Sequence, residues 1–217
     1  MFVGHYAASL ALKSFEKRVS LGVLFLAVQF VDILFFPFVL VGIERMNIVE
    51  NFTQSTHFEL EYMPFTHGLL ASVLWAAAAY VVFRWVVVKK QSVALVVALA
   101  VFSHWLLDLP VHTPDLPLWS DSSPKLGFGL WNNAVVTYLF EAGLLLLTLW
   151  MYLRSTKATT VVGKYGMAVF IGILLVINVS NIFGDPMVQS KIGLAIFALS
   201  SYFLFAVVAF WLDRKRI

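Results

Sequence analysis

Three ionisable side chains stand at helical spacing within one apolar stretch of this chain. His104, Asp108 and His112 follow one another at intervals of four residues. On a helix this spacing stacks them on one face, at least until Pro110 bends the backbone. An imidazole and a carboxylate one turn apart can bind the same divalent cation, since both are ligands for zinc, manganese or iron. The stretch therefore predicts part of a metal site.

Other acids and imidazoles lie in or beside further apolar stretches, where charge costs ~2.5–3.5 kcal/mol in a membrane. These are His5, Asp32, His67 and Glu141. A single such residue could simply form a hydrogen bond that holds two helices together. Several of them at a similar depth favour a functional site. The chain has no cysteine, so any ligands are nitrogen and oxygen. Several carboxylates in such a set are typical of a hydrolytic centre with one or two ions.

Depth along each stretch indicates which of these residues can meet. At ~1.5 Å per residue, Asp32 and His104 lie ~20 and ~18 Å from the predicted cytoplasmic side. Glu141 lies ~15 Å from the other side, nearly the same level in a ~30 Å core. His5 would reach this level from below if its segment inserts, and His67 lies nearer the outside. We expect a polar cavity open to the outside, lined by these side chains.

Short motifs around these residues resemble one family. Gly4-His5, Pro64-Phe65-Thr66-His67-Gly68 and Ser103-His104-Trp105-Leu106-Leu107-Asp108 are similar to the pattern of the YdjM-like bacterial inner-membrane proteins, predicted membrane-bound metal-dependent hydrolases. The resemblance covers roughly residues 1–115. Many members carry a further histidine and arginine where Met63, Pro64 and Phe65 stand here. The resemblance implies a divalent metal held by His5, His67, His104 and Asp108, to which depth and chemistry add Asp32 as a ligand.

The segment 112–130 is rich in proline, glycine and tryptophan, and we expect it to form a lid over the cavity. Lys125 would bind an anionic head group, and Asp115 or Glu141 would be the general base or a second carboxylate behind the metal. His112, Trp131 and Asn132 are further candidates for orienting ligands or substrate.

The composition of the chain indicates that these residues are positioned by a membrane protein. Of 217 residues, 61% are hydrophobic and 12% charged, against about 45–50% and about 25% in soluble domains. The net charge is +3 without a basic run outside the turns and ends, so no nucleic-acid partner is expected. We predict one all-α transmembrane domain over residues 1–217, because the apolar runs do not alternate as barrel strands do. Its six spans are about 19–43, 67–88, 92–111, 131–153, 161–183 and 192–212.

Basic residues orient these spans. Twelve of the 15 lysines and arginines fall in the connections and ends on one side, and only Arg45, Lys125 and Lys191 fall on the other. By the positive-inside rule both termini are cytoplasmic. Residues 1–13 are too short to span, so the sequence leaves two placements open for them: half-inserted among the helices, or lying at the inner interface.

The leading hypothesis is a hydrolase of the bacterial inner membrane. A divalent ion, with zinc ahead of manganese or iron, would activate water against an ester or phosphoester at the outer side, on a membrane lipid or a lipid-linked substrate. A small proton- or cation-coupled permease using Asp32 and Glu141 is the alternative. A haem carrier is a third reading, although Asp108 one turn from His104 would be a poor neighbour for haem.

Overall fold

The apolar stretches form long helices in the computed structural model, which describes residues 1–185 and 190–217. α4 (Leu69–Val82) continues into a π-helical turn, η1 (Phe83–Val87), and is followed by α5 (Gln91–Val111), α6 (Ala134–Ser155), α7 (Val161–Phe183) and α8 (Lys191–Asp213). Among the described residues, these five helical segments are each long and apolar enough to cross a membrane. The prediction of an all-helical, multi-pass membrane bundle is therefore confirmed at that level.

The first predicted span is interrupted. It consists of α2 (Leu21–Val28) and α3 (Phe30–Leu40), whose axes differ by 46° on either side of Gln29. Counting this bent pair as one span gives six. The expectation of one run over 19–43 has to be corrected to a broken helix, with Asp32 in the first turn of its second half.

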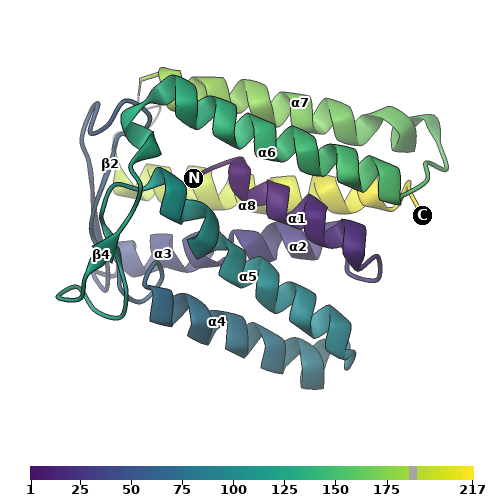
Figure 1. The fold of residues 1–217 in the computed structure, drawn as a ribbon, viewed down its shortest axis with the longest axis horizontal. Helices are drawn as coiled ribbons and strands as arrows, with labels where there is room; N and C mark the ends of the chain where they lie inside the picture. The colour runs from purple at the N-terminus through teal and green to yellow at the C-terminus, as the bar shows by residue number, and fades with distance from the viewer. Residues whose placement is uncertain (186–189) are drawn as a thin grey trace.

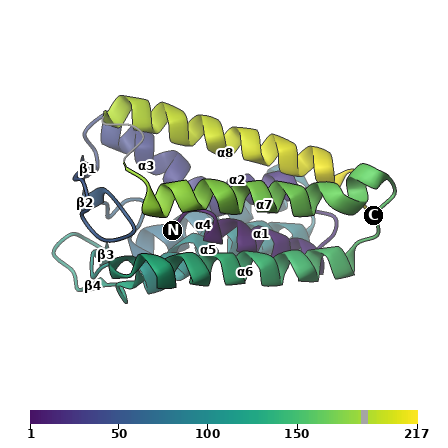
Figure 2. The same ribbon diagram turned by 90° about the horizontal axis from the view of Figure 1, so that it is seen from above.

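Helix α1 (Gly4–Phe15) lies inside the bundle, against α2, α5 and α6 (Figures 1 and 2). His5, Tyr6, Ser9 and Leu10 are all fully buried on it. Its first turn is held by α6, because the Oε2 atom of Glu141 accepts hydrogen bonds from the backbone N–H of Gly4 at 3.0 Å and of Phe2 at 3.3 Å. Of the two placements that the sequence left open, the structure has the inserted one.

Two short antiparallel hairpins cover one end of the bundle (Figure 1). β1 (Arg45–Ile48) pairs with β2 (Phe58–Tyr62), and β3 (Leu116–Pro117) pairs with β4 (Lys125–Leu126). The second hairpin and the 3-10 turn η2 (Leu130–Asn132) belong to the segment predicted as a lid. These hairpins were not predicted from the sequence. We call this end of the bundle the hairpin end.

The connections rich in lysine and arginine meet at the opposite end, with the C-terminus (Figure 1). There Lys13 Nζ lies 2.8 Å from Asp213 Oδ2, and the hydroxyl of Tyr152 donates to Asp213 Oδ1 at 3.0 Å. Helices α7 and α8 also approach closely at this end, because a Cβ at Gly163 would overlap the carbonyl oxygen of Lys215. The two ends thus differ in charge as predicted, while the side of the membrane that each faces stays a prediction.

Candidate metal centre

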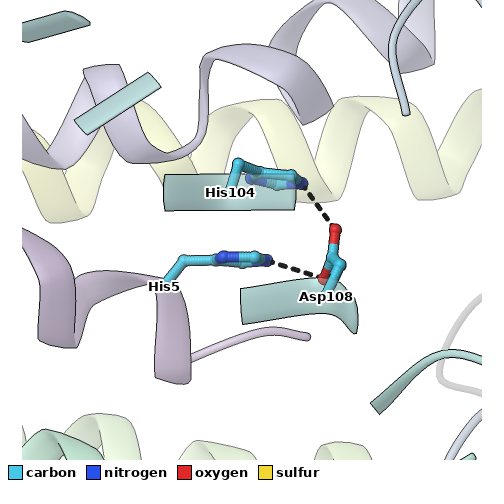
Figure 3. Close-up of side chains that lie close together, drawn as sticks. All are labelled: His5, His104 and Asp108. Carbon is cyan, nitrogen blue, oxygen red and sulfur yellow. Dashed lines mark ion pairs between the residues drawn. The ribbon is translucent and has the colours of Figure 1, made fainter. Parts of the chain in front are cut away.

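Six ionisable side chains from four separate parts of the chain meet near the hairpin end. His5 comes from α1 and Asp32 from α3, while His67 precedes α4 and His104 and Asp108 project from α5, with His112 directly after it. The four imidazoles and Asp108 are at most 4% exposed, and the Asp32 side chain is 16% exposed. Figure 3 shows His5 and His104 side by side, each directed at Asp108.

Asp108 lies between the imidazoles. Its Oδ1 atom is 3.2 Å from His5 Nε2 and 3.6 Å from His112 Nε2. Its Oδ2 atom is 3.1 Å from His104 Nε2 and 4.0 Å from His67 Nε2. The two carboxylate oxygens therefore face different pairs of imidazoles.

Asp32 lies at one side of this cluster, beside two of the imidazoles. Its Oδ1 atom lies 3.3 Å from His67 Nε2 and 3.6 Å from His104 Nε2, and its Oδ2 atom accepts a hydrogen bond from the Tyr202 hydroxyl at 3.0 Å. Two atoms bound to one tetrahedral zinc ion at ~2.1 Å are separated by about 3.4 Å. His5, His104 and Asp108 form one group that could hold an ion, and Asp32, His67 and His104 form another.

The imidazole of His104 is oriented by the break in the first span. Its Nδ1 atom lies 2.7 Å from the carbonyl oxygen of Val28, the last residue of α2. A carbonyl can only accept, so Nδ1 carries the proton and Nε2 of the neutral ring keeps its lone pair. That lone pair is directed into the cluster.

His67 is oriented by two residues outside the spans. Its Nδ1 atom lies 2.8 Å from the Thr66 hydroxyl, which donates to Glu44 Oε2 at 2.7 Å. The hydroxyl proton is used by Glu44, so its oxygen accepts from Nδ1–H and leaves Nε2 free. Burial raises the pKa of the Glu44 carboxyl, while the donors on Thr66 and Phe65 favour its ionised form.

His112 follows the same pattern. Its Nδ1 atom lies 2.8 Å from Asp115 Oδ1, and its ring lies 4.1 Å from that of Trp131, measured between centroids. Metal-binding histidines usually donate their second N–H to a carboxylate or carbonyl in this way, which sets both tautomer and ring orientation.

His5 is held by packing. Its ring stacks on that of His104 with centroids 3.8 Å apart and planes within 8°. Both of its nitrogens, and Oδ2 of Asp108, are buried without a hydrogen bond to any described residue. The amino group of Met1 donates to Asp108 Oδ1 at 2.8 Å. Buried polar atoms without partners are costly unless a further group satisfies them, so a cation fits this donor set.

The structure thus brings together His5, Asp32, His67, His104 and Asp108, with His112 and Trp131 beside them. Other predicted residues lie elsewhere. Asp115 is behind His112, Asn132 is exposed, and Lys125 forms an ion pair with Asp121 at 2.7 Å. Glu141 lines the same cavity, but its Oε2 atom is directed at the first turn of α1.

Sequence reasoning missed the supporting residues Val28, Glu44, Thr66 and Tyr202. Thr66 directly precedes His67 in the motif, so its position in the sequence could have indicated a supporting role. Glu44 and Tyr202 reach the site only through tertiary contacts, and no local spacing distinguishes them.

One cavity of about 460 Å³ is lined by Asp32, His67, His104, Asp108 and His112, together with many apolar side chains; His5 lies behind its wall. Comparison with known proteins adds no assignment, since no family model, curated protein or solved structure matches this chain. Any functional assignment therefore rests on the geometry of this cluster.

Proposed function

We propose that this protein is a membrane-embedded, metal-dependent hydrolase. The observation that supports the proposal is the shared orientation of three imidazoles. His67, His104 and His112 each use Nδ1 for a hydrogen bond and direct Nε2 at the buried carboxylates of Asp32 and Asp108. Among the described residues, the Met1 amino group donates to Asp108 and the Tyr202 hydroxyl donates to Asp32. The imidazole lone pairs that converge on the same carboxylates have no donor of their own among those residues, and a bound cation would satisfy them.

The ligand roles follow from the distances. Asp32, His67 and His104 would hold one ion, and His5, His104 and Asp108 form the other group that could hold one, with His104 common to both. Zinc suits this mixture of imidazole and carboxylate, as do manganese and iron. When bound, such an ion supplies a Lewis acid and lowers the pKa of water.

Two carboxylates of the protein would have roles other than metal binding. Glu141 lines the cavity and is the candidate general base, and Asp115 holds the tautomer of His112.

The substrate would be an ester or phosphoester on a membrane lipid or lipid-linked molecule at the outer side of a bacterial inner membrane. Both termini would then be cytoplasmic, as the basic end indicates.

Metal content of the purified protein tests this proposal. Wild type in detergent should carry about one or two equivalents of zinc, manganese or iron, and His104→Ala and Asp108→Ala should lose most of it. His57→Ala is the matched control, because His57 lies in the β1–β2 hairpin, where its Nε2 atom contacts the carbonyl of Gly184 at 3.0 Å. A metal-free wild type that chelators do not affect would overturn the proposal. Cation-coupled flux in liposomes would then favour the permease.

A further inference from the structure

The cavity at the candidate metal centre continues between α3, α7 and α8. Apart from the metal donors, much of its wall is aromatic and aliphatic. Examples are Phe35 and Phe36 on α3, Ile177 on α7, and Phe197 and Tyr202 on α8. One cavity therefore has a charged region and an apolar region, and we call the apolar region the apolar chamber.

The chamber reaches the surface of the bundle between α7 and α8. Ser180 and Phe197 line it and are also exposed, Phe197 to 47%. The surrounding surface of the two helices is apolar, with Ile173, Val176 and Leu204 each more than half exposed. In a membrane these side chains face hydrocarbon, so the opening faces lipid.

The packing of α7 on α8 explains where this opening lies. At the basic end glycines allow close contact, since a Cβ at Gly163 would meet the backbone of Lys215 and one at Gly166 would meet the side chain of Leu212. From there the two helices diverge toward the hairpin end (Figure 2). The residues that line the cavity lie in this diverging half, from Ile177 on α7 and from Leu194 to Phe205 on α8.

We propose that the apolar chamber holds one alkyl or acyl chain of an amphiphile, which enters from the lipid between α7 and α8 and places its phosphate or ester group at the metal donors. The inference rests on the proposed function for the identity of the head group, but the chain-binding step stands on the chamber alone. An anionic head group would lie at the imidazoles and at an ion held by them, and a hydrocarbon chain would pack against the aromatic wall. Ser180, Asn181 and Ser201 are further polar residues that line the cavity.

Physical chemistry limits what the chamber contributes. Lipid tails are as apolar as the chamber, so moving a chain from the bilayer into it gains little hydrophobic free energy. The chamber would instead fix where the chain lies, and so select substrates with a chain and position the bond to be cleaved. Binding strength would come from the head group.

Photolabelling tests the proposal directly. The full chain is reconstituted in vesicles that contain phosphatidic acid with a diazirine at the end of one acyl chain, irradiated, and mapped by mass spectrometry. Phe35, Phe36 and Tyr202 are at most 8% exposed, so bulk lipid does not reach them. We expect adducts on these residues in wild type.

Two variants make the test specific. Ala198→Trp fills the chamber from α8 and should lower these adducts about tenfold, as a loss of about 1.4 kcal/mol in binding would. Ser200→Trp is the matched control, because Ser200 is exposed on the same helix and does not line the cavity. The chain has no cysteine, so the thiol of Ser201→Cys can be modified selectively after folding with a bulky methanethiosulfonate, which forms a mixed disulfide. This modification should abolish the adducts, and a reductant that removes the bulky group before irradiation should restore them.

The outcomes separate this inference from the proposed function. Adducts confined to exposed positions such as Val176 and Leu204, or unchanged by Ala198→Trp and by the blocked Ser201→Cys, would overturn chain binding even if metal is present. If the wild type holds no metal but adducts still form on Phe35 and Tyr202, chain binding would be supported and the hydrolase proposal would be overturned. A melting temperature and an elution volume in detergent that match those of the wild type show that Ala198→Trp is folded, whether or not the protein holds metal.

Discussion

The Nδ1 atom of His104 lies 2.7 Å from the carbonyl oxygen of Val28, at the point where the first span breaks. In an unbroken helix that carbonyl would accept from the N–H four residues later. Here α2 ends at Val28, and the carbonyl orients a buried imidazole on α5 instead. The break in the span thus sets the tautomer of His104, a candidate metal ligand, because it frees the carbonyl that accepts from Nδ1. It also positions Asp32, in the first turn after the break, beside the same imidazole.

Thr66→Val should weaken metal binding without removing a ligand. Valine has a similar volume but lacks the hydroxyl that accepts from His67 and donates to Glu44. Loss of such a supporting hydrogen bond typically costs about 10- to 100-fold in metal affinity. Competition with a chromogenic chelator measures it, and Thr66→Ser should stay within a few-fold of wild type. Equal affinity in the valine variant would contradict the role of this hydroxyl.

Glu141 can be tested for its structural and catalytic roles separately. Glu141→Ala leaves the N–H groups of Phe2 and Gly4 without their acceptor and should cost about 1–3 kcal/mol in the free energy of unfolding. Glu141→Gln keeps an oxygen acceptor and should unfold near the wild-type midpoint.

Hydrolysis of bis(p-nitrophenyl) phosphate gives the second readout. If Glu141 is the general base, both variants lose activity, since an amide cannot take up the proton. Full activity in the glutamine variant would exclude that role and leave Glu141 as the residue that holds α1 in place.

The ion pair between Lys13 and Asp213 predicts a stability effect far from the metal site. Both side chains are about one-tenth exposed, and their charged atoms are 2.8 Å apart. Lys13→Met leaves the Asp213 charge buried and unpaired, which should cost about 3–5 kcal/mol. Adding Asp213→Asn removes that charge and keeps one oxygen acceptor for the Leu21 N–H, while the amide NH2 can donate to the Tyr152 hydroxyl oxygen. The double variant should therefore be more stable than Lys13→Met. Denaturant unfolding in detergent decides it, and a double variant less stable than the single would refute the argument.

The turn between α1 and α2 predicts a pH dependence. Hydrogen bonds from the Arg18 guanidinium lower the pKa of Glu16 to about 2 from an ordinary value of 4.5. A depressed carboxyl pKa stabilises the folded state at pH values above 4.5, and this contribution is lost as the pH falls toward 2. Arg18 is half exposed, so the effect should be small and reduced by salt.

Comparison of Glu16→Gln with wild type isolates this contribution from the histidine cluster. The variant should melt below wild type at pH 7, and the difference between the two melting temperatures should shrink steadily below pH 4.5. A difference that stays constant down to pH 2 would show that the ionised form of Glu16 does not stabilise the turn.

Sequence alone determined the features that depend on local spacing and composition. Apolar length predicted the helices of the bundle, because a span needs enough consecutive residues whatever its neighbours are. The interval between His104 and Asp108 placed them one turn apart on a single helix. The acids and imidazoles inside apolar runs marked the cluster, because an isolated charge in hydrocarbon is unfavourable wherever the helix packs.

Only the tertiary structure decided how those residues meet. Helix α1 could have lain on the surface, and its burial among α2, α5 and α6 is what brings His5 to Asp108. The hydrogen bonds of Thr66 to Glu44 and of Tyr202 to Asp32 join residues far apart in the chain. The break at Gln29 leaves the Val28 carbonyl free to contact His104. Such contacts depend on the angles at which helices cross and on the backbone groups that a break leaves free. Neither property is encoded in the hydropathy or spacing of any one segment, so the supporting residues of the site emerge only from the packed bundle.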